Sequence, residues 1–565
     1  MTLSTDLPTS IPEQRTSTET IEPGEPEAPR NRRRYVGWGL TVLAGVILLF
    51  TLVLPNEFRN FTPAWFLRIP VEALLGTAIV LAVPRRFGRI AAVLAGVAVG
   101  IVTILKVIDM FFILFMLRSA DPVLDWTLLG NGMDFITESY GKAGAAGTVL
   151  VVALLIGAVL AVTIWSTLRL TRLVVTHRRN AAVTALVLAV AWVLLAVTNI
   201  EIVPGEPVAA KSATGYTYYR ALQARKSMQD KETFAREAAV DAFAGVPSTD
   251  LLTGLRGKDV VFAFVESYGF SAATDPRYQS EIGAVVDEGQ KRLQAAGYAS
   301  RSGFLTSPTA GGGSWFAHAT FLSGLWIDNQ QRYKSLVSSN RMTLGKAFQK
   351  ADWDTVGVMP GIIRKWPEGE YFGYERVYGK EALGYRGPRF GFAPMPDQYT
   401  LAQFQKQERG KSGRSPLMAE IELISSHTPW ATPPNLVDWN AVGDGSRGFQ
   451  PPSGDDGGSL LGGTAQARAA YAKTIGYSLR SLISYVETYG DDNLVLVFLG
   501  DHQPTGNVTD NSRNFTVPIT IVARDTAILD RTASWGWQDG LRPRPDAPVW
   551  KMSDFRDRFL TAFAK

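Results

Sequence analysis

The chain has 565 residues, of which 46% are apolar, a formal net charge of +5 and no cysteine. Its length allows several domains, and its Lys and Arg residues gather beside apolar runs, which argues against a nucleic-acid-binding surface. Without cysteine the chain forms no disulfide, performs no thiolate catalysis and holds no cysteine-ligated zinc. Any metal ion must therefore be held by oxygen and nitrogen ligands.

Long apolar runs dominate the first third of the chain. Residues 1–34, rich in Thr, Pro and Glu, are expected to form a disordered cytoplasmic tail. After them come five runs close to the roughly 20 apolar residues that span a bilayer. These runs cover residues 35–55, 66–84, 90–117, 145–168 and 181–201. We therefore predict a five-helix transmembrane domain over residues 35–203.

Arginine clusters orient these runs. They precede the first run and follow the second and the fourth, so that in a five-helix bundle all three lie on one side. The positive-inside rule makes that side the cytoplasm. An odd number of spans then places everything after residue 201 outside the cell. The sequence thus predicts a multi-pass plasma-membrane protein with an extracellular C-terminal part.

Two charged residues lie within the third apolar run. Lys106 and Asp109 are three residues apart and share one face of the predicted helix. Charges at that depth are costly unless they are paired. We expect the two side chains to neutralise each other inside the bundle, and a path for substrate is the alternative interpretation.

The composition changes after the last apolar run. A connector with amphipathic helical pieces is expected over residues 204–255. Beyond it, over 256–565, apolar strands alternate with helical periods, which is typical of an α/β domain with a largely parallel sheet. Strands this apolar should be covered on both faces. They are expected at residues 259–265, 300–306, 354–359, 416–424, 493–499 and 517–523.

Polar residues follow four of these strands directly. Glu266 follows the first, and the loop "SPTAGGG" after the second leads to Ser314, which opens a helical stretch. His427 follows the fourth strand, and Asp501 and His502 follow the fifth. Because ligands bind outside the carboxyl ends of parallel strands, we expect these side chains to meet at one edge. A lone carboxylate after a strand is more often a turn or a helix cap, so the combination carries the prediction.

These residue types suit metal-assisted nucleophilic chemistry. Glu266, Asp501, His502 and the Ser314 hydroxyl make a four-ligand set for one Zn or Mn ion, with Mg also compatible. Metal coordination and the start of a helix both favour the ionised hydroxyl, which is otherwise a poor nucleophile. Nearby hydroxyls at Thr306, Ser307 and Thr309 are alternatives to Ser314. His427 remains to bind substrate oxygens or to protonate a leaving group.

The motifs resemble the alkaline phosphatase/sulfatase superfamily, most closely its membrane branch of lipoteichoic acid synthases and lipid phosphoglycerol transferases. "VFAFVESYG" matches the metal-binding Glu266, "LGDHQP" the pair Asp501 and His502, and "ISSHTPW" the substrate histidine His427. Ser314 stands ten residues before Gly324, which is the nucleophile spacing of sulfatases, although the branch usually has Thr there. The resemblance implies five membrane helices followed by an extracellular sulfatase-like domain.

The resemblance also implies a substrate segment and an activity. Trp366 and Arg364 in "IRKWPEG" are expected to bind substrate, although Gly361 stands where the synthases carry an acid. The implied enzyme moves a head group, glycerol phosphate from phosphatidylglycerol, through a phosphoserine to an envelope glycan or glycolipid. Alternatives are a phosphodiesterase, a phosphoethanolamine transferase and a non-catalytic receptor. Sulfate-ester hydrolysis is disfavoured because no cysteine exists to become formylglycine.

Overall fold

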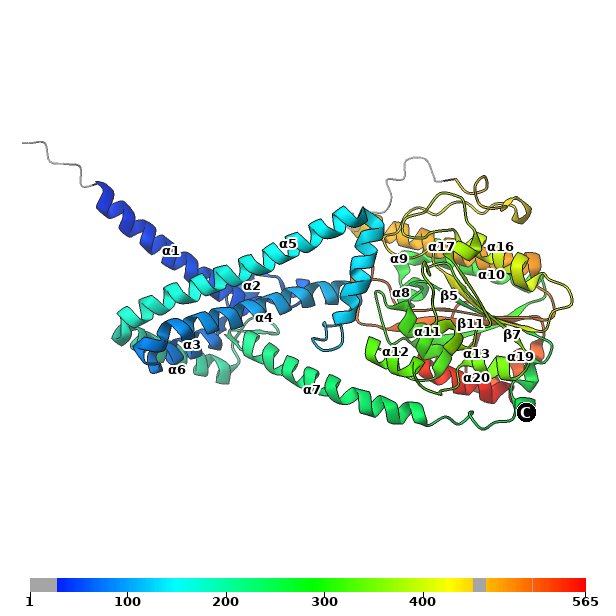
Figure 1. Cartoon of the computed structure of the whole chain (residues 1–565), viewed down its shortest axis with the longest axis horizontal. Helices are drawn as coiled ribbons and strands as arrows, with labels where there is room; N and C mark the ends of the chain where they lie inside the picture. The colour runs from blue at the N-terminus through cyan, green and yellow to red at the C-terminus, as the bar shows by residue number, and fades with distance from the viewer. Residues whose placement is uncertain (1–27, 451–463, 511) are drawn as a thin grey trace, which may run out of the picture.

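The computed structural model describes residues 28–450, 464–510 and 512–565 and has a helical part and an α/β part (Figure 1). Most of the predicted tail, residues 1–27, lies outside the described residues, and helix α1 begins at Ala28. Helix α7 (Ser212–Ala239) runs from the helical part to the α/β part, within the predicted connector.

The helical part contains four helices long and apolar enough to cross a membrane, among the described residues. Their apolar stretches are Arg34–Val53, Arg85–Met116, Gly141–Thr176 and Arg178–Thr198. They belong to α1 (Ala28–Val53), α4 (Gly88–Met116), α5 (Trp126–Thr176) and α6 (Arg178–Thr198). Helix α5 bends at Gly141, whose φ of 72° is left-handed, so the part before Gly141 lies crosswise next to the α/β part (Figure 1).

The second expected span is a shorter helix. The run 66–84 contains only α3 (Val71–Ala82), which has 12 residues. At 1.5 Å per residue such a helix is about 18 Å long, less than the ~30 Å hydrocarbon core. Pro70 precedes α3 and Pro84 follows it, and the residue before a proline avoids the helical region. Five complete spans therefore remain a prediction.

The two intramembrane charges have other partners than expected. Both Lys106 and Asp109 are buried. Lys106 Nζ donates to the carbonyl oxygen of Leu52, at 3.1 Å. Asp109 pairs instead with Arg220 of α7, and it accepts a hydrogen bond from Tyr216 Oη at 2.9 Å. The charge on α4 thus ties α7 to the helical part.

The α/β part is built on a nine-stranded sheet. Its order is β12-β6-β11-β10-β5-β9-β7-β8, with β13 beside β6. The strands β10, β5, β9, β7 and β8 are mutually parallel, whereas β11 is antiparallel to both its neighbours. The strands are β5 (Asp259–Val265), β6 (Ala299–Thr306), β7 (Asp354–Met359), β8 (Arg376–Gly379), β9 (Leu417–Leu423), β10 (Leu494–Gly500), β11 (Thr516–Ala523), β12 (Gln538–Asp539) and β13 (Val549–Lys551).

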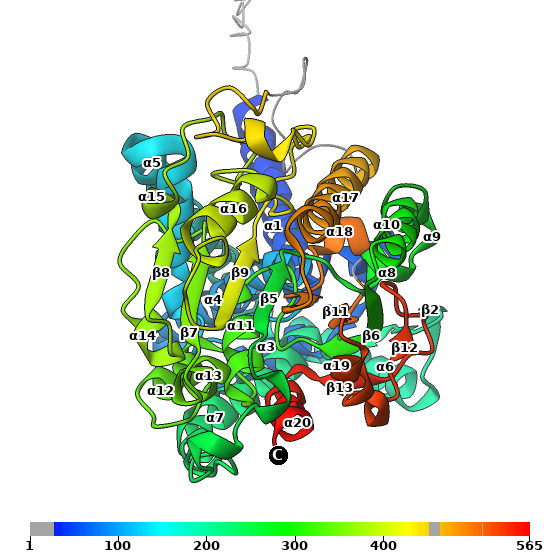
Figure 2. The ribbon, with the colours of Figure 1, turned by 90° about the vertical axis from the view of Figure 1, so that its right-hand side faces the viewer.

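Helices cover both faces of this sheet (Figure 2). One core lies against α10 (Ala284–Ala295), α16 (Asp397–Phe404) and α17 (Thr464–Tyr489). The other lies against α11 (Ser314–Ser323), α13 (Leu344–Lys350) and α20 (Phe555–Phe563). Because helices exclude water from both faces, the central strands consist of continuous apolar residues. All six predicted strands are present.

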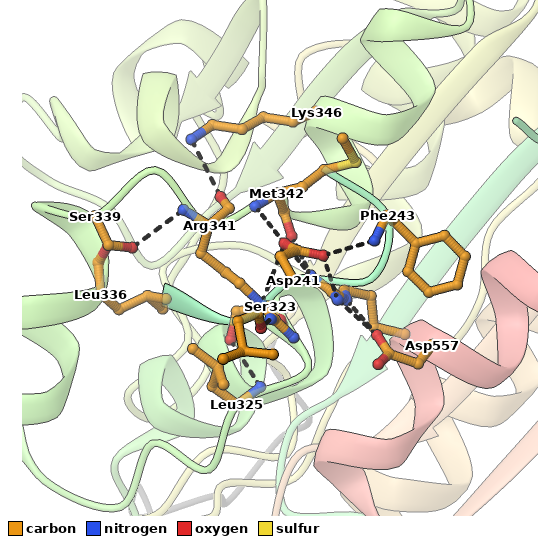
Figure 3. Close-up of polar contacts among 12 residues, drawn as sticks. Asp241, Phe243, Ser323, Leu325, Leu336, Ser339, Arg341, Met342, Lys346 and Asp557 are labelled. Atoms are coloured by element: carbon orange, nitrogen blue, oxygen red, sulfur yellow. Dashed lines mark hydrogen bonds and ion pairs between the residues drawn. The ribbon is translucent and has the colours of Figure 1, made fainter. Parts of the chain in front are cut away.

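The connector is fixed to both parts of the molecule. At its start, Glu72 of α3 accepts hydrogen bonds from the backbone N–H groups of Ala213 and Thr214, at 2.9 and 2.7 Å. Just after the end of α7, Asp241 accepts from the N–H groups of Phe243 and Met342, both at 3.0 Å (Figure 3). These bonds fix one end of α7 to the helical part and the other end to the α/β part.

Buried arginines strengthen the second anchor. Arg556 of α20 is fully buried and donates to both carboxylate oxygens of Asp241, at 3.0 Å each. Arg341 Nε lies 3.4 Å from Asp241, on the side opposite Asp557 in the close-up (Figure 3). The carboxylate of Asp241 is therefore surrounded by donors.

Candidate active site

Three neighbouring parallel strands end level with one another at one edge of the sheet. Gly500 of β10 pairs with Val265 of β5, and Val265 pairs with Leu423 of β9. The residues after each strand therefore leave the sheet at one place, outside its carboxyl ends. Position 500 requires glycine, because a Cβ there would overlap the carbonyl oxygen of Tyr268. The segment after β5 thus crosses directly over the end of β10.

Glu266, Asp501 and His502 form a compact group at this edge. One ligand atom of each lies within 4.8 Å of those of the other two, and all three residues are buried. His502 Nε2 is 3.4 Å from Glu266 Oε1 and 3.5 Å from Asp501 Oδ2. His502 Nδ1 lies 2.8 Å from the carbonyl oxygen of Gln503, so we assign the proton to Nδ1, which donates there. The lone pair of Nε2 then faces the carboxylates, as metal coordination requires.

Two carboxylates buried this close together call for a cation. Burial and the negative charge of Glu266 raise the pKa of Asp501 well above its usual range. Burial acts in the same direction on Glu266, but the imidazoles of His502 and His427 hold the pKa of Glu266 low. A divalent ion would offset both the burial and the repulsion of the carboxylates. This donor set fits one Zn or Mn ion, or Mg.

The Ser314 hydroxyl lies against this group. Ser314 opens α11, and its Oγ donates to Glu266 Oε2 at 2.9 Å and lies 3.3 Å from His502 Nε2. Two alternative hydroxyls donate to backbone carbonyl oxygens instead: Ser307 Oγ to that of Asp501 at 2.6 Å, and Thr309 Oγ1 to that of Gly312, in the same loop, at 2.5 Å. The geometry thus brings together Ser314 and the three ligand-type residues.

A cavity of about 290 Å³ opens beside Ser314. Among the residues that line it are Glu266, Ser314, His318, Gly361, Ile362, Trp366, Phe392, Glu420, Glu422 and His427. Two of the expected substrate residues, His427 and Trp366, therefore face one space. The ring of His427 stacks on Phe392, with centroids 4.1 Å apart. Arg364 is exposed on the loop that carries Trp366, outside the described lining.

Sequence reasoning missed one wall of this cavity. His318 lies one turn after Ser314 on α11, and its Nδ1 is 2.5 Å from Glu420 Oε1. Burial lowers the pKa of His318, but the hydrogen bond and the charge of Glu420 outweigh it and raise the pKa. The sequence feature that could have predicted this wall is the segment "AEIEL", where two acids alternate with apolar residues in an expected strand. Side chains two apart share a face, so Glu420 and Glu422 point the same way.

Glu422 also explains the glycine in the substrate segment. The backbone N–H of Gly361 donates to Glu422 Oε2 at 3.1 Å, and a Cβ at position 361 would lie 3.0 Å from that oxygen. A carboxylate from the neighbouring strand β9 therefore lies directly beside Gly361.

The loop before Ser314 rests on a membrane helix. Gly311 has a φ of 71°, and a Cβ there would overlap the carbonyl oxygen of Phe115, near the C-terminal end of α4. The other side of the loop is held by the Gly311 N–H, which donates to the carbonyl oxygen of Gln503 at 2.7 Å. The loop is therefore fixed between α4 and the segment that follows His502.

No protein-family model and no curated protein matches the chain. Similar solved structures include the lipoteichoic acid synthase LtaP of Listeria monocytogenes, 14% identical over 60% of this chain and 78% of that chain, with a TM-score of 0.37. The phosphoglycerol transferase GacH of Streptococcus pyogenes, in complex with sn-glycerol-1-phosphate, is 12% identical over 60% and 90%, with a TM-score of 0.34. The phosphoethanolamine transferase EptA of Neisseria meningitidis is 13% identical over 92% and 95%, with a TM-score of 0.42.

Proposed function

We propose that this protein is a metal-dependent phosphotransferase of the plasma membrane, with its α/β domain outside the cell. The observation that carries the proposal is the Ser314 hydroxyl, which lies at the start of α11 in hydrogen-bond contact with Glu266 and close to His502. A hydroxyl held there is placed to become a nucleophile. A divalent ion bound by Glu266, Asp501 and His502 would lower its pKa and neutralise charge on a phosphoryl group.

The reaction would run in two displacements. In the first, Ser314 Oγ gives its proton to Glu266 Oε2, the acceptor of its hydrogen bond, and forms a bond to phosphorus. The bond from phosphorus to the diacylglycerol oxygen breaks, and that oxygen takes up a proton. His427, on the wall of the same cavity, is placed to supply this proton. In the second, an acceptor hydroxyl attacks the phosphoserine and loses its proton to His427. The bond from phosphorus to Ser314 Oγ breaks, and Ser314 takes its proton back from Glu266. The acceptor would be an envelope glycan or glycolipid.

The position of the nucleophile supports a lipid donor. Ser314 is three residues after Gly311, which touches the end of α4. At no more than about 3.6 Å per residue, its Cα lies within about 11 Å of that contact. A head group at the bilayer surface is therefore within reach, whereas nucleotide donors are not normally supplied outside the cell. Trp366 and Arg364 would contact the substrate from the loop after β7.

The resemblance in the sequence favours phosphatidylglycerol as the donor and glycerol phosphate as the group moved. The carboxylate that Glu422 places at Gly361 is compatible with this, because it restores an acceptor for glycerol hydroxyls. If water takes the place of the acceptor, the same site is a phosphodiesterase. A non-catalytic receptor is disfavoured because Glu266, Ser314, Asp501 and His502 are all present and adjacent.

The direct test uses the purified full-length protein with Mn²⁺ and fluorescent phospholipids. We expect metal-dependent release of diacylglycerol, and a phosphorylated peptide that contains residue 314. Diacylglycerol without added acceptor would favour the phosphodiesterase. A phosphate on Thr309 would contradict the assignment of the nucleophile. If none of the common phospholipids yields diacylglycerol, the lipid-donor proposal is wrong.

A further inference from the structure

Buried hydrogen bonds hold the turn that carries His427. The turn follows β9, and Ser425 and Ser426 precede the histidine. Ser426 Oγ donates to the carbonyl oxygen of Glu266 at 2.6 Å, and the carbonyl oxygen of Ser426 accepts from Trp430 Nε1 at 2.8 Å. The middle of the turn is therefore fixed beside the backbone of Glu266.

The first residue of the turn is bonded to Asp397. The Ser425 N–H donates to Asp397 Oδ1 at 2.9 Å, and Ser425 Oγ accepts from the Asp397 N–H at 3.0 Å. Ser478 Oγ of α17 donates to Asp397 Oδ2 at 2.5 Å. Asp397 opens α16, is fully buried and is not among the described residues that line the catalytic cavity. Any effect of Asp397 on the reaction must therefore pass through the residues that it holds.

The carboxylate of Asp397 bonds to other elements than its own helix. An acid at the start of a helix often accepts from the free N–H groups there. The described bonds of this carboxylate go instead to the turn after β9 and to α17. Burial raises the pKa of Asp397 to about 6, although the hydrogen bonds of Ser478 and Ser425 oppose this rise. At neutral pH the carboxylate is thus largely ionised, and hydrogen bonds to an ionised acceptor are stronger than neutral ones.

The ring of His427 is held within the same turn. Its Nδ1 lies 2.5 Å from the carbonyl oxygen of Thr428, so we assign the proton to Nδ1, which donates there. Nε2 is then the nitrogen that exchanges protons with the substrate. Because the ring is bonded to its own turn, the place of Nε2 in the cavity depends on where the turn lies.

We infer that Asp397 is a positioning residue for His427 and acts through the backbone of Ser425. The inference rests on the proposed function, in which His427 gives a proton to the diacylglycerol oxygen. This transfer requires hydrogen-bond distance between the two atoms, and a displacement of about 1 Å can lower the rate about 10²-fold. Asp397 itself takes no part in bond making. Its loss should therefore slow only those reactions whose leaving group needs the proton.

The test compares two leaving groups in the first displacement. Full-length protein with Mn²⁺ is kept in excess over substrate, so that a single turnover is measured. The diacylglycerol oxygen needs a proton as it leaves phosphatidylglycerol, whereas para-nitrophenolate leaves bis(para-nitrophenyl) phosphate without one. We expect Asp397→Ala to slow diacylglycerol release by about 30-fold and nitrophenolate release by less than about threefold. His427→Gln should show the same selectivity with a larger loss, of about 10³-fold.

A matched control lies next to Asp397 on α16. Gln398 also makes two bonds to one residue of the chain after β9: its Nε2 donates to the carbonyl oxygen of Val437 at 2.7 Å, and its Oε1 accepts from the Val437 N–H at 3.0 Å. Gln398 is fully buried as well. Gln398→Ala thus removes a similar pair of bonds at a point beyond His427, and both reactions should keep their rates.

A second variant covers the case in which Asp397→Ala folds poorly. Ser425→Ala removes the acceptor of the Asp397 N–H and leaves the bonds of the Asp397 carboxylate in place. We expect it to slow diacylglycerol release by about fivefold, again with little effect on nitrophenolate release.

The outcomes separate this inference from the proposed function. Equal losses on both substrates in Asp397→Ala, with metal content unchanged, would show that Asp397 only stabilises the fold. A selective loss in Gln398→Ala would also overturn the inference, because the effect would then belong to α16 as a whole. Unchanged diacylglycerol release in Asp397→Ala and Ser425→Ala would overturn it too. No diacylglycerol from the wild type would instead overturn the proposed lipid phosphotransferase on which the inference rests.

Discussion

Two buried charge clusters in this chain differ in how their charges are paired. Just after the end of α7, Asp241 accepts two hydrogen bonds from Arg556 and lies 3.4 Å from Arg341. At the edge of the sheet, Glu266 and Asp501 both lie within 3.5 Å of the His502 imidazole, with no guanidinium among the described ion pairs of either carboxylate. The first cluster brings guanidinium groups to a carboxylate, whereas the second brings carboxylates to each other.

The pKa values of the two aspartates move in opposite directions. Burial would raise the pKa of Asp241, but the hydrogen bonds and charge of Arg556 hold it below its usual range. Burial and the charge of Glu266 raise the pKa of Asp501. A carboxylate kept ionised by arginines stabilises the fold, whereas one that lacks a cation gains most from an ion taken up from solution. The comparison separates a structural cluster from a binding site.

The largest effect is expected at the nucleophile. Ser314→Ala should lower diacylglycerol release by at least about 10³-fold, because the group that attacks phosphorus is removed. The variant should keep its metal content and melting temperature, since Glu266, Asp501 and His502 are unchanged. Residual turnover above about a tenth of the wild-type rate would show that another group is the nucleophile.

A substitution in the structural cluster around Asp241 should lower stability and leave turnover unchanged. Asp241→Asn leaves Arg556 buried without its counter-charge in that position, and we expect a loss of about 3 kcal/mol in the free energy of unfolding. Chemical denaturation in the presence of Mn²⁺ measures the loss. Turnover per folded molecule should be unchanged. Asp546→Asn, which removes an exposed partner of Arg544, is the control. Similar stability of both variants would contradict the role of the buried cluster.

A substitution in the binding site should change the free energy of unfolding in opposite directions with and without the metal ion. Asn at position 501 keeps the acceptor for the N–H groups of Ser267 and His502 and adds a donor toward Glu266. In chelator, Asp501→Asn should therefore raise the free energy of unfolding, by about 2 kcal/mol. In Mn²⁺ the order should reverse, because the wild type gains bound ion. Thermal melts of both proteins in both buffers measure this, and destabilisation by the substitution in chelator would contradict it.

The pH dependence sharpens the same comparison. The folded pKa of Asp501 is raised, so the stability it contributes is present below the unfolded pKa and is lost as pH rises through the folded pKa. Asp241 has a lowered pKa, so its contribution is present above the unfolded pKa and is lost as pH falls through the folded one. In chelator, Asp501→Asn should reduce the fall of the free energy of unfolding toward higher pH. Asp241→Asn should reduce its fall toward lower pH.

The sheet and the ligand group were predictable because their signals are local. Strands buried on both faces are uniformly apolar, and parallel strands deliver the residues after them to one edge. The edge strand β8 was missed because it is short, half-buried and begins with Arg376. Helix α3 is shorter than the apolar run 66–84 because Pro70 and Pro84 lie at its two ends.

The missed contacts depend on tertiary placement. Glu420 and Glu422 were within an expected strand, but only the packing of α11 on β9 shows that they face Ser314. Likewise, Asp109 pairs with Arg220, far along the chain, and its neighbour Lys106 turns to a carbonyl group. Such partners follow from how helices pack, which residue spacing does not encode.

The smallest expected effect tests whether the membrane part helps to position the nucleophile. Gly311→Ala and Gly413→Ala place alanine at nearly equal φ values, 71° and 73°, and left-handed backbone costs about 1–2 kcal/mol at either position. Only at position 311 does the new Cβ overlap the carbonyl oxygen of Phe115, since position 413 is open. Gly311→Ala should therefore push the loop away from α4 and displace Ser314.

We expect Gly311→Ala to lower kcat for diacylglycerol release by about tenfold, or about 1.4 kcal/mol in transition-state free energy. KM and metal content should change little, because the cavity wall and the ligand group lie elsewhere. Gly413→Ala shares the backbone strain without the overlap and should retain its turnover. If the two variants have equal kcat values, α4 serves only as an anchor. If only Gly311→Ala is slow, the end of this membrane helix is part of what holds the nucleophile in place.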